Sequence, residues 1–248
     1  MKILITHEIP DRGINLLKSK GYDIAVGNAF NKQELIVELG KDRYDAVLCD
    51  LNDRLDGEVF DAAGKQCKIF ANYAVGYDNV DLKAAAERGI AITNTPGVLT
   101  DTVAEHTFAL LLAIAHRVAE GDRFTRAGKY HGWEPLLLLG TDVSKKTLGI
   151  VGLGRIGSRV AHHAVLGFEM NVLYYDVKRN EEFENELHLE VGPATSRGPT
   201  SSRPPAEFRA DPDEVFREAD FISIHVPFIA ATHHLVDESR LALMKKTA

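Results

Sequence analysis

The feature that most constrains this fold is a glycine-rich turn between a predicted strand and a predicted helix. Residues 146–157 read KTLGIVGLGRIG, in which Gly152, Gly154 and Gly157 follow a short apolar run. A helical pattern begins at Arg155. In such a GxGxxG turn, the first glycine makes the tight bend and the second lets a phosphate approach the backbone. The third lets the helix pack closely on the strand.

A second predicted strand gives this motif its context, because glycine triplets alone occur by chance in many loops. The strand NVLYYDV, 171–177, follows the helix and carries Asp176. A carboxylate there accepts hydrogen bonds from the ribose hydroxyls of a dinucleotide, and the helix N-terminus faces its pyrophosphate. The pattern predicts an NAD site and disfavours NADP, although Lys178 and Arg179 could partly neutralise a 2′-phosphate. A plain strand–helix–strand unit with a glycine turn is the alternative interpretation.

Composition narrows the class of protein. The chain has 248 residues, 45% hydrophobic and 26% charged, with a formal net charge of −7. These values are typical of a soluble globular enzyme and argue against a nucleic-acid binder. Cys49 and Cys67 are the only cysteines and lack metal-site spacing, which favours the cytoplasm. The first residues, MKILITHEIP, lack the long apolar core of a signal peptide, and no apolar run is long enough to span a membrane.

The first part of the chain alternates short β-branched runs with helical patterns. This alternation predicts a parallel sheet covered on both faces, a flavodoxin-like domain over residues 1–99. The predicted strands are 2–6, 22–26, 45–49, 67–71 and 90–93. The predicted helices are the segment around 14–17, then 33–39 and 82–89, the last closed by Gly89.

The second part, residues 100–248, predicts a Rossmann domain. A long apolar helix at 103–120, with Thr100 or Asp101 as its N-cap, is expected to be buried between domains or subunits. The glycine turn, a helix at 213–220 and a strand at 221–226 complete the pattern. The fold class is therefore α/β, with two parallel-sheet domains and a cleft between them.

Residues 192–212 interrupt this alternation. They hold five of the nine prolines and almost no large apolar residue. Such a composition buries too little surface to offset the entropy of ordering, so we expect an irregular loop. Trypsin should cleave first in this loop, at Arg197, Arg203 or Arg209.

Several segments together resemble the D-isomer-specific 2-hydroxyacid dehydrogenases, in particular their glyoxylate/hydroxypyruvate reductase branch. The resemblance covers nearly the whole chain outside 188–212. Its specific segments are ANYAVGYDNVD (71–81), ITNTPGVLTDTVAEHTFALLLA (92–113), GKYHGWEP (128–135), the glycine turn with Asp176, and ADFISIHVP (219–227). The resemblance implies a nicotinamide-dependent enzyme that reduces a small 2-keto acid to the D-hydroxy acid, or catalyses the reverse reaction.

The resemblance also implies roles for individual residues. Backbone N–H groups of Val75 and Gly76 would hold the substrate carboxylate, as convergent donors do in a backbone nest, although a simple turn is the alternative. Thr102 would lie near the nicotinamide, or merely contribute to a helix cap. The remaining cofactor-binding residues implied are Gly152, Gly154, Arg155, Ile156, Gly157, Asp176, His225, Val226, Pro227 and Thr232.

Other candidate residues receive no chemical role. The adjacent pairs His162-His163 and His233-His234 have diverging side chains, so we assign no metal site. The family's similar WxP segment would place Trp133 at the substrate entrance, but a packing role is the expectation here. Residues 136–139 are too apolar to be left in water and predict a docking face. By the resemblance, this region contributes to a homodimer.

The family's catalytic arginine, glutamate and histidine all match positions after Ala248, so no catalytic residue is assigned within 1–248. We therefore expect a C-terminally truncated copy or a partial sequence, with an incomplete nucleotide domain. Weak or no NADH binding, poor solubility and glyoxylate reduction indistinguishable from background are expected of the chain as written. Two functions stay open: an NAD-dependent 2-hydroxyacid dehydrogenase, or a nucleotide-binding remnant or interaction module without turnover. The residues do not identify which 2-hydroxy acid is used, and a phosphoglycerate dehydrogenase would belong to the first of these two classes.

Overall fold

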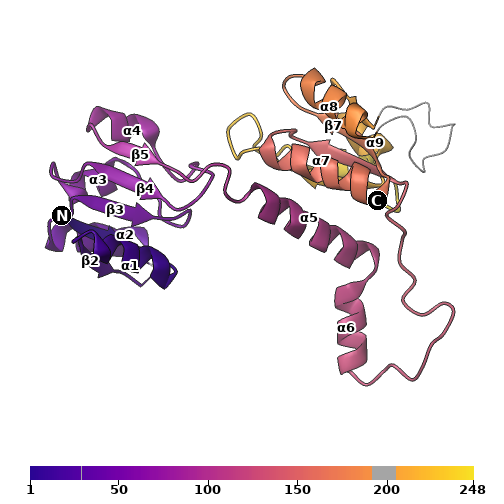
Figure 1. Ribbon diagram of the computed structural model, residues 1–248, viewed down its shortest axis with the longest axis horizontal. Coiled ribbons are helices and arrows are strands. Elements are labelled where there is room, and N and C mark those ends of the chain that lie inside the picture. Colours follow the sequence, from indigo (N-terminus) through magenta and orange to yellow (C-terminus); the bar gives the residue numbers. More distant parts are fainter. Residues whose placement is uncertain (29, 192–204) are drawn as a thin grey trace. The chain divides into compact units, whose positions relative to one another are not determined.

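The computed structural model describes residues 1–28, 30–191 and 205–248. The chain forms two compact units, Met1–Val98 and Leu99–Ala248, and each is described by itself (Figure 1). Within the described residues, no helix is both long and apolar enough to cross a membrane.

The first unit is a five-stranded parallel sheet with the strand order β2-β1-β3-β4-β5, the flavodoxin-like order. Apolar side chains of β3 and β4 alternate between its two faces, and α2, α3 and α4 pack on one of these faces. The elements are β1 (Lys2–Ile5), α1 (Asp11–Ser19), β2 (Asp23–Val26), α2 (Lys32–Lys41), β3 (Ala46–Cys49), α3 (Gly57–Ala63), β4 (Ile69–Asn72), α4 (Leu82–Glu87) and β5 (Ala91–Thr93).

The second unit contains a four-stranded parallel sheet with the order β8-β7-β6-β9. This is the order of the first four of the six strands of a Rossmann sheet, in which the strand order reverses beside the first strand. The elements are α5 (Thr100–Ala115), α6 (Val118–Arg126), β6 (Thr147–Val151), α7 (Arg155–Phe168), β7 (Asn171–Tyr175), α8 (Glu181–Val191), β8 (Ala206–Phe208), α9 (Pro212–Glu218), β9 (Phe221–Ile224) and α10 (Glu238–Leu243).

The two faces of this second sheet bury different clusters. Leu148 and Ile150 of β6 join the cluster formed with α5 and α7, whereas Val151 joins Val215 and Phe216 of α9. The period of two along β6 therefore explains why helices cover both faces. The α/β class and the two parallel sheets predicted from the sequence are confirmed.

The predicted helix at 103–120 is wrong in its extent, because it is two helices, α5 and α6, set at an angle (Figure 1). Arg117 breaks the helix with a left-handed φ of 54°. The carbonyl of Ala115 instead accepts a hydrogen bond from the N–H of Thr141, at 2.8 Å. The predicted N-cap is also wrong. Leu99 precedes the first helical residue and makes no side-chain cap.

The predicted loop at 192–212 is wrong over its last part, while residues 192–204 lie outside the described residues. Ala206–Phe208 form β8, which pairs in parallel with β7. Ala206 is buried, and the Phe208 ring lies 5.5 Å from that of Tyr174. Arg209 forms ion pairs with Glu207 and Glu218, so it is a poor trypsin site. These few apolar residues suffice to order a short strand, because β8 pairs with a neighbouring strand, β7, of the same sheet.

Candidate functional site

The glycine turn has the geometry that its sequence predicts. Gly152 has a φ of 97°, which L side chains rarely adopt. A Cβ on Gly157 would lie 2.1 Å from the Gly152 carbonyl oxygen, so only glycine lets α7 approach the turn. A Cβ on Gly154 would meet no atom within 4 Å. The protein itself therefore does not require glycine at 154, and the space beside it is open at the N-terminus of α7.

Asp176 lies directly after β7 and is bonded to the glycine turn. Its Oδ2 accepts a hydrogen bond from the N–H of Leu153 at 2.7 Å, and its Oδ1 accepts one from the N–H of Val177 at 2.7 Å. Each carboxylate oxygen keeps a second lone pair for another donor. Asp176 thus fixes the turn while it still offers acceptors at the edge of the sheet.

The end of β9 contributes the opposite wall of the turn. The N–H of His225 bonds to the Val151 carbonyl at 2.8 Å. A Cβ on Gly152 would lie 2.8 Å from the carbonyl carbon of His225 and 3.0 Å from Cγ1 of Val226. Burial lowers the pKa of His225, whose Nε2 lies 2.8 Å from the Ser223 hydroxyl oxygen. The structure thus brings the 152–157 turn, Asp176 and residues 225–226 together at the switch point of this sheet.

Two further residues implied for this site lie on its periphery. Thr102 is exposed in the first turn of α5, which an Asp101–Arg159 ion pair of 2.6 Å joins to α7. The Thr232 hydroxyl accepts from the N–H of Ile229 at 3.0 Å and donates to the Pro227 carbonyl, so it closes the loop after β9. Neither observation assigns a ligand contact.

The carboxylate-binding pair lies in the first unit, in the turn after β4. Val75 is half-buried and Gly76 is exposed. In the part of the chain that the structure describes, no protein atom accepts a hydrogen bond from either N–H group. Because the two units are not placed relative to one another, the predicted cleft between them stays a prediction.

Sequence reasoning missed a polar cluster at the switch point of the first sheet. His7 Nε2 lies 3.4 Å from Asp50 Oδ1 and 3.2 Å from Asp53 Oδ1. Burial raises the pKa of Asp53, whose Oδ2 accepts a hydrogen bond from the Thr6 hydroxyl. Ligand atoms this close could hold a metal ion, but pairing between His7 and the two carboxylates explains the same geometry.

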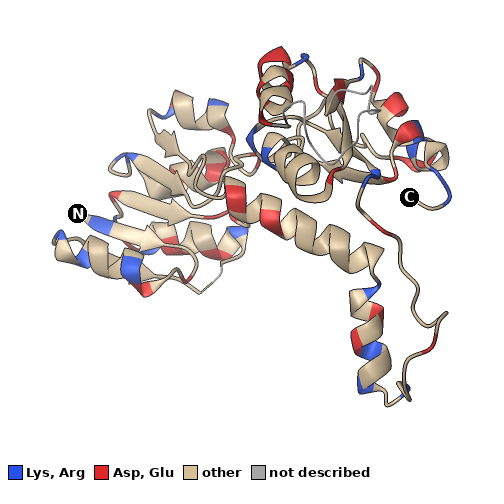
Figure 2. Ribbon diagram, turned by 45° about the vertical axis from the view of Figure 1, so that its right-hand side comes forward, with Lys and Arg blue, Asp and Glu red and all other residues tan. Residues whose placement is uncertain are grey.

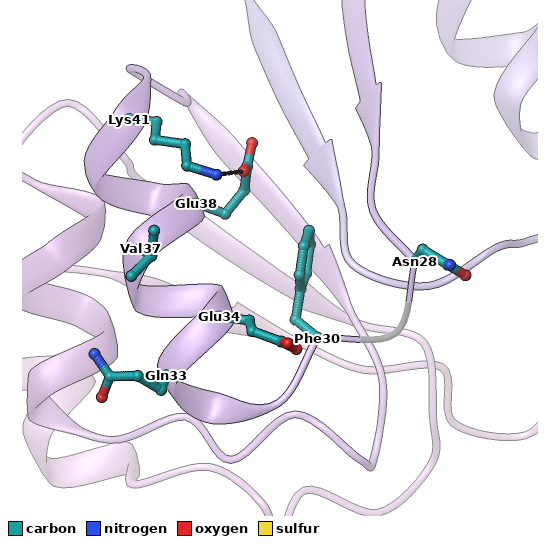
Figure 3. Close-up of a pocket in the computed structure, with 7 residues that line it drawn as sticks. All are labelled: Asn28, Phe30, Gln33, Glu34, Val37, Glu38 and Lys41. Atoms are coloured by element: carbon teal, nitrogen blue, oxygen red, sulfur yellow. Dashed lines mark hydrogen bonds and ion pairs between the residues drawn. The ribbon is translucent and has the colours of Figure 1, made fainter.

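A separate pocket of the first unit contains none of the predicted site residues. Figure 3 shows its lining along one side of α2, where Lys41 pairs with Glu38 at 3.2 Å. The remaining lining residues are Asn28, Phe30, Gln33, Glu34 and Val37. We assign this pocket no function.

The Trp133 side chain is 82% exposed, so the packing role expected for it is not met within the described part of this chain. Leu136 and Leu139 are exposed as well. On α5, Leu110 and Ile114 face away from the core that Phe108 and Leu111 help to form. Figure 2 shows that the charged residues of α5 are confined to its first turns.

Two parallel α/β units, the second with a glycine turn at its switch point, define the class of two-domain nucleotide-binding α/β proteins. Within that class, the profile of the D-isomer specific 2-hydroxyacid dehydrogenase catalytic domain matches residues 3–246. The chain belongs to this family, and is thus an NAD(P)-dependent oxidoreductase of the 2-hydroxyacid dehydrogenase class.

Relatives and solved structures agree with this assignment. The chain is 45% identical to the glyoxylate reductase of Korarchaeum cryptofilum over 249 residues, which is 100% of this chain and 69% of that protein. It is 44% identical to the glyoxylate reductase of Pyrococcus horikoshii over 253 residues, which again covers 100% of this chain and 69% of that protein.

Among solved structures, the TT0316 protein of Thermus thermophilus is similar with a TM-score of 0.83 and 38% identity, covering 99% of this chain and 71% of that one. The D-lactate dehydrogenase of Aquifex aeolicus, complexed with NAD and lactic acid, is similar with a TM-score of 0.77 and 27% identity. That match covers 99% of this chain and 66% of the other.

Proposed function

We propose that the protein transfers a hydride between NADH and a small 2-keto acid of the glyoxylate or hydroxypyruvate type, giving the D-2-hydroxy acid. The names of the relatives support the glyoxylate type. Residues 1–99 would bind the substrate and residues 100–248 the nucleotide. The observation that carries the proposal is the open glycine turn, held by Asp176 at the carboxyl edge of the sheet.

The pyrophosphate would lie on the N-terminus of α7. The first N–H groups of a helix have no partner within it, and the helix dipole favours an anion there. In this proposal Gly154, Arg155, Ile156 and Gly157 hold the phosphates, and Gly152 shapes the turn. His225, Val226 and Pro227 wall the adenosine, with Thr232 holding their loop, and Thr102 lies toward the nicotinamide.

The preference for NAD over NADP would come from Asp176. A 2′-phosphate would be placed against this carboxylate and would displace a charged hydrogen bond, worth about 1.5–3 kcal/mol. Arg179 is already paired with Glu184 at 2.7 Å, and this pairing raises the pKa of Arg179. It is therefore less available to neutralise a phosphate than its sequence position indicates.

The substrate carboxylate would bind the N–H groups of Val75 and Gly76. The hydride leaves negative charge on the keto oxygen, which a proton donor must meet. We assign that donor to none of the described residues.

A homodimer is part of the proposal. Exposed apolar side chains on α5 and in the 130–139 segment would be covered by a second copy, since such a surface is costly to leave in water. A cytoplasmic location is proposed too, because Cys49 and Cys67 are free and buried.

Nucleotide binding tests the proposal. NADH fluorescence should titrate with the wild-type chain and fail to titrate with Gly154→Val, whose side chain would occupy the open space at the turn. Circular dichroism and thermal unfolding should show that the variant stays folded, since no protein atom lies near its Cβ. Equal NADH affinity of the two proteins would contradict the proposed phosphate site.

A further inference from the structure

The turn after β4 holds its three successive carbonyl groups by hydrogen bonds from elsewhere in the first unit. The Ala74 carbonyl accepts from the backbone N–H of Thr95 at 2.8 Å. The Val75 carbonyl accepts from Asn94 Nδ2 at 2.8 Å, and the Gly76 carbonyl accepts from Asn72 Nδ2 at 2.8 Å. Two of the three bonds therefore come from asparagine side chains.

These bonds determine where the following N–H groups point. In a planar trans peptide, the N–H of one residue points opposite to the carbonyl of the residue before it, and the chain has no cis peptide. The bond from Asn94 to the Val75 carbonyl therefore directs the Gly76 N–H away from Asn94. In the same way, the bond from Asn72 directs the N–H of Tyr77 outward.

All three outward N–H groups are available to a ligand. Across the ranges that the structure describes, no protein acceptor bonds to the N–H of Val75, Gly76 or Tyr77. Backbone N–H groups are obligatory donors, so these three must bind water or a ligand acceptor. Successive free N–H groups in a turn form the concave donor set that binds anions.

The amide of Asn72 is itself fixed in orientation. Asn72 is buried, and its Oδ1 lies 3.4 Å from Asn79 Nδ2 and 3.9 Å from the thiol of Cys49. Asn79 Nδ2 also donates to the Asp50 and Asp53 carbonyls, at 3.0 Å each. Asn72 Nδ2 donates to the Gly76 carbonyl at 2.8 Å and lies 3.4 Å from Asn79 Oδ1, so its contacts are with acceptors, whereas Oδ1 lies beside the thiol of Cys49.

We propose that Asn72 and Asn94 are positioning residues, which pin the carbonyls of Gly76 and Val75 and so orient the N–H groups of Tyr77 and Gly76. With the N–H of Val75, these groups form a three-donor nest for the carboxylate of a 2-keto acid. This inference rests on the proposed function for the identity of the ligand. It adds the Tyr77 N–H to the expected pair, and it assigns the orientation of two of the three donors to side chains that do not touch the substrate.

The test is an NMR titration of the ¹⁵N-labelled 248-residue chain with oxamate, an unreactive analogue of a 2-keto acid. In the wild type, the amide signals of Val75, Gly76 and Tyr77 should shift together. Asn94→Asp replaces the donor by an acceptor of equal size. It should raise the oxamate concentration at the midpoint of the titration about tenfold or more, and the amide signal of Gly76 should be affected most. Asn72→Asp should do the same with the largest change at Tyr77.

Controls separate positioning from folding. Asn31→Asp adds the same charge at the N-cap of α2, where a carboxylate can still accept from the N–H of Glu34, and should titrate like the wild type. Asn94→Gln keeps a donor and should recover part of the affinity. If the buried Asn72→Asp variant unfolds, the half-buried Asn94 variants still decide the question.

Two results would overturn the inference: asparagine variants that titrate like the wild type, or wild-type signals of residues 75–77 that do not respond to oxamate. NADH fluorescence, measured on the same samples, reports on the proposed nucleotide site independently. If the wild type does not bind NADH, the proposed function is contradicted. If the wild type binds NADH but either of the two oxamate results above is found, only the proposed nest is contradicted.

Discussion

The three glycines of the nucleotide turn share a motif but differ in what surrounds each Cα. Gly157 faces the Gly152 carbonyl oxygen, where a Cβ would lie only 2.1 Å away. We expect Gly157→Ala to destabilise the protein by roughly 1–3 kcal/mol, because backbone must move to relieve the overlap. Urea unfolding followed by circular dichroism measures this change.

Gly154→Ala is the matched control for that measurement. Its Cβ would meet no atom within 4 Å, and the φ of Gly154 is −74°. The free energy of unfolding should change by about 1 kcal/mol or less, the usual effect at an N-cap. Equal destabilisation by the two variants would contradict the packing role of Gly157.

His225 should make stability depend on pH. Burial lowers its pKa in the folded state, so the unfolded chain binds the proton more readily. This contribution to stability is fully present above the ordinary histidine pKa, about 6.5, and is lost as the pH falls below it. Between pH 7.5 and 5.5, His225→Gln should therefore lose less stability than the wild type does.

His106→Gln, a substitution at an exposed position of α5, is the control and should show the pH dependence of the wild type. Parallel curves of stability against pH for all three proteins would refute the role of His225.

At the scale of elements, apolar periodicity predicted the strands well but could not predict where helices end. At the break between α5 and α6, the Ala115 carbonyl accepts a hydrogen bond from the N–H of Thr141, a residue far along the chain. The sequence analysis missed β8 because this strand has only three residues and lies in a proline-rich segment. It forms by pairing with β7, at the edge of the sheet. The helices α3, α8 and α10 are short or weakly apolar, and the sequence analysis did not identify them.

The exposed apolar face of α5 gives a prediction about assembly. Ile114 is 75% exposed, and a charge there would be buried in the proposed dimer. Ile114→Glu should weaken dimerisation about tenfold or more, because an unpaired buried charge is costly. Light scattering after size exclusion compares the variant with the wild type. Val37→Glu, at an exposed position of α2 in the first unit, should leave the dimer intact. A wild type that remains monomeric at every concentration would contradict the proposed dimer.

At the scale of the whole molecule, the two-unit α/β organisation and the family could be predicted because their signals are local. The glycine turn, Asp176 and the strand ends each lie in short segments of characteristic composition. The bonds that organise the site could not be predicted in this way. The link from Leu153 to Asp176 and the link from Asn94 to Val75 join residues far apart in sequence, and only the fold brings them together.

The central claim is that Asp176 selects NADH at the glycine turn. Because this carboxylate also holds the N–H of Leu153, Asp176→Ser would disturb the turn as well as the selectivity. Asp176→Asn removes the charge and keeps one acceptor oxygen in a side chain of equal size, which can still bond the N–H of Leu153, so it disturbs the turn less and is the sharper variant.

The decisive measurement is a pair of fluorescence titrations with NADH and NADPH, on the wild type and on Asp176→Asn. The wild type should prefer NADH by about 10- to 100-fold, the equivalent of a charged hydrogen bond of roughly 1.5–3 kcal/mol. Asp176→Asn should narrow that ratio. Equal wild-type affinity for the two nucleotides, or a ratio unchanged in the variant, would contradict the account.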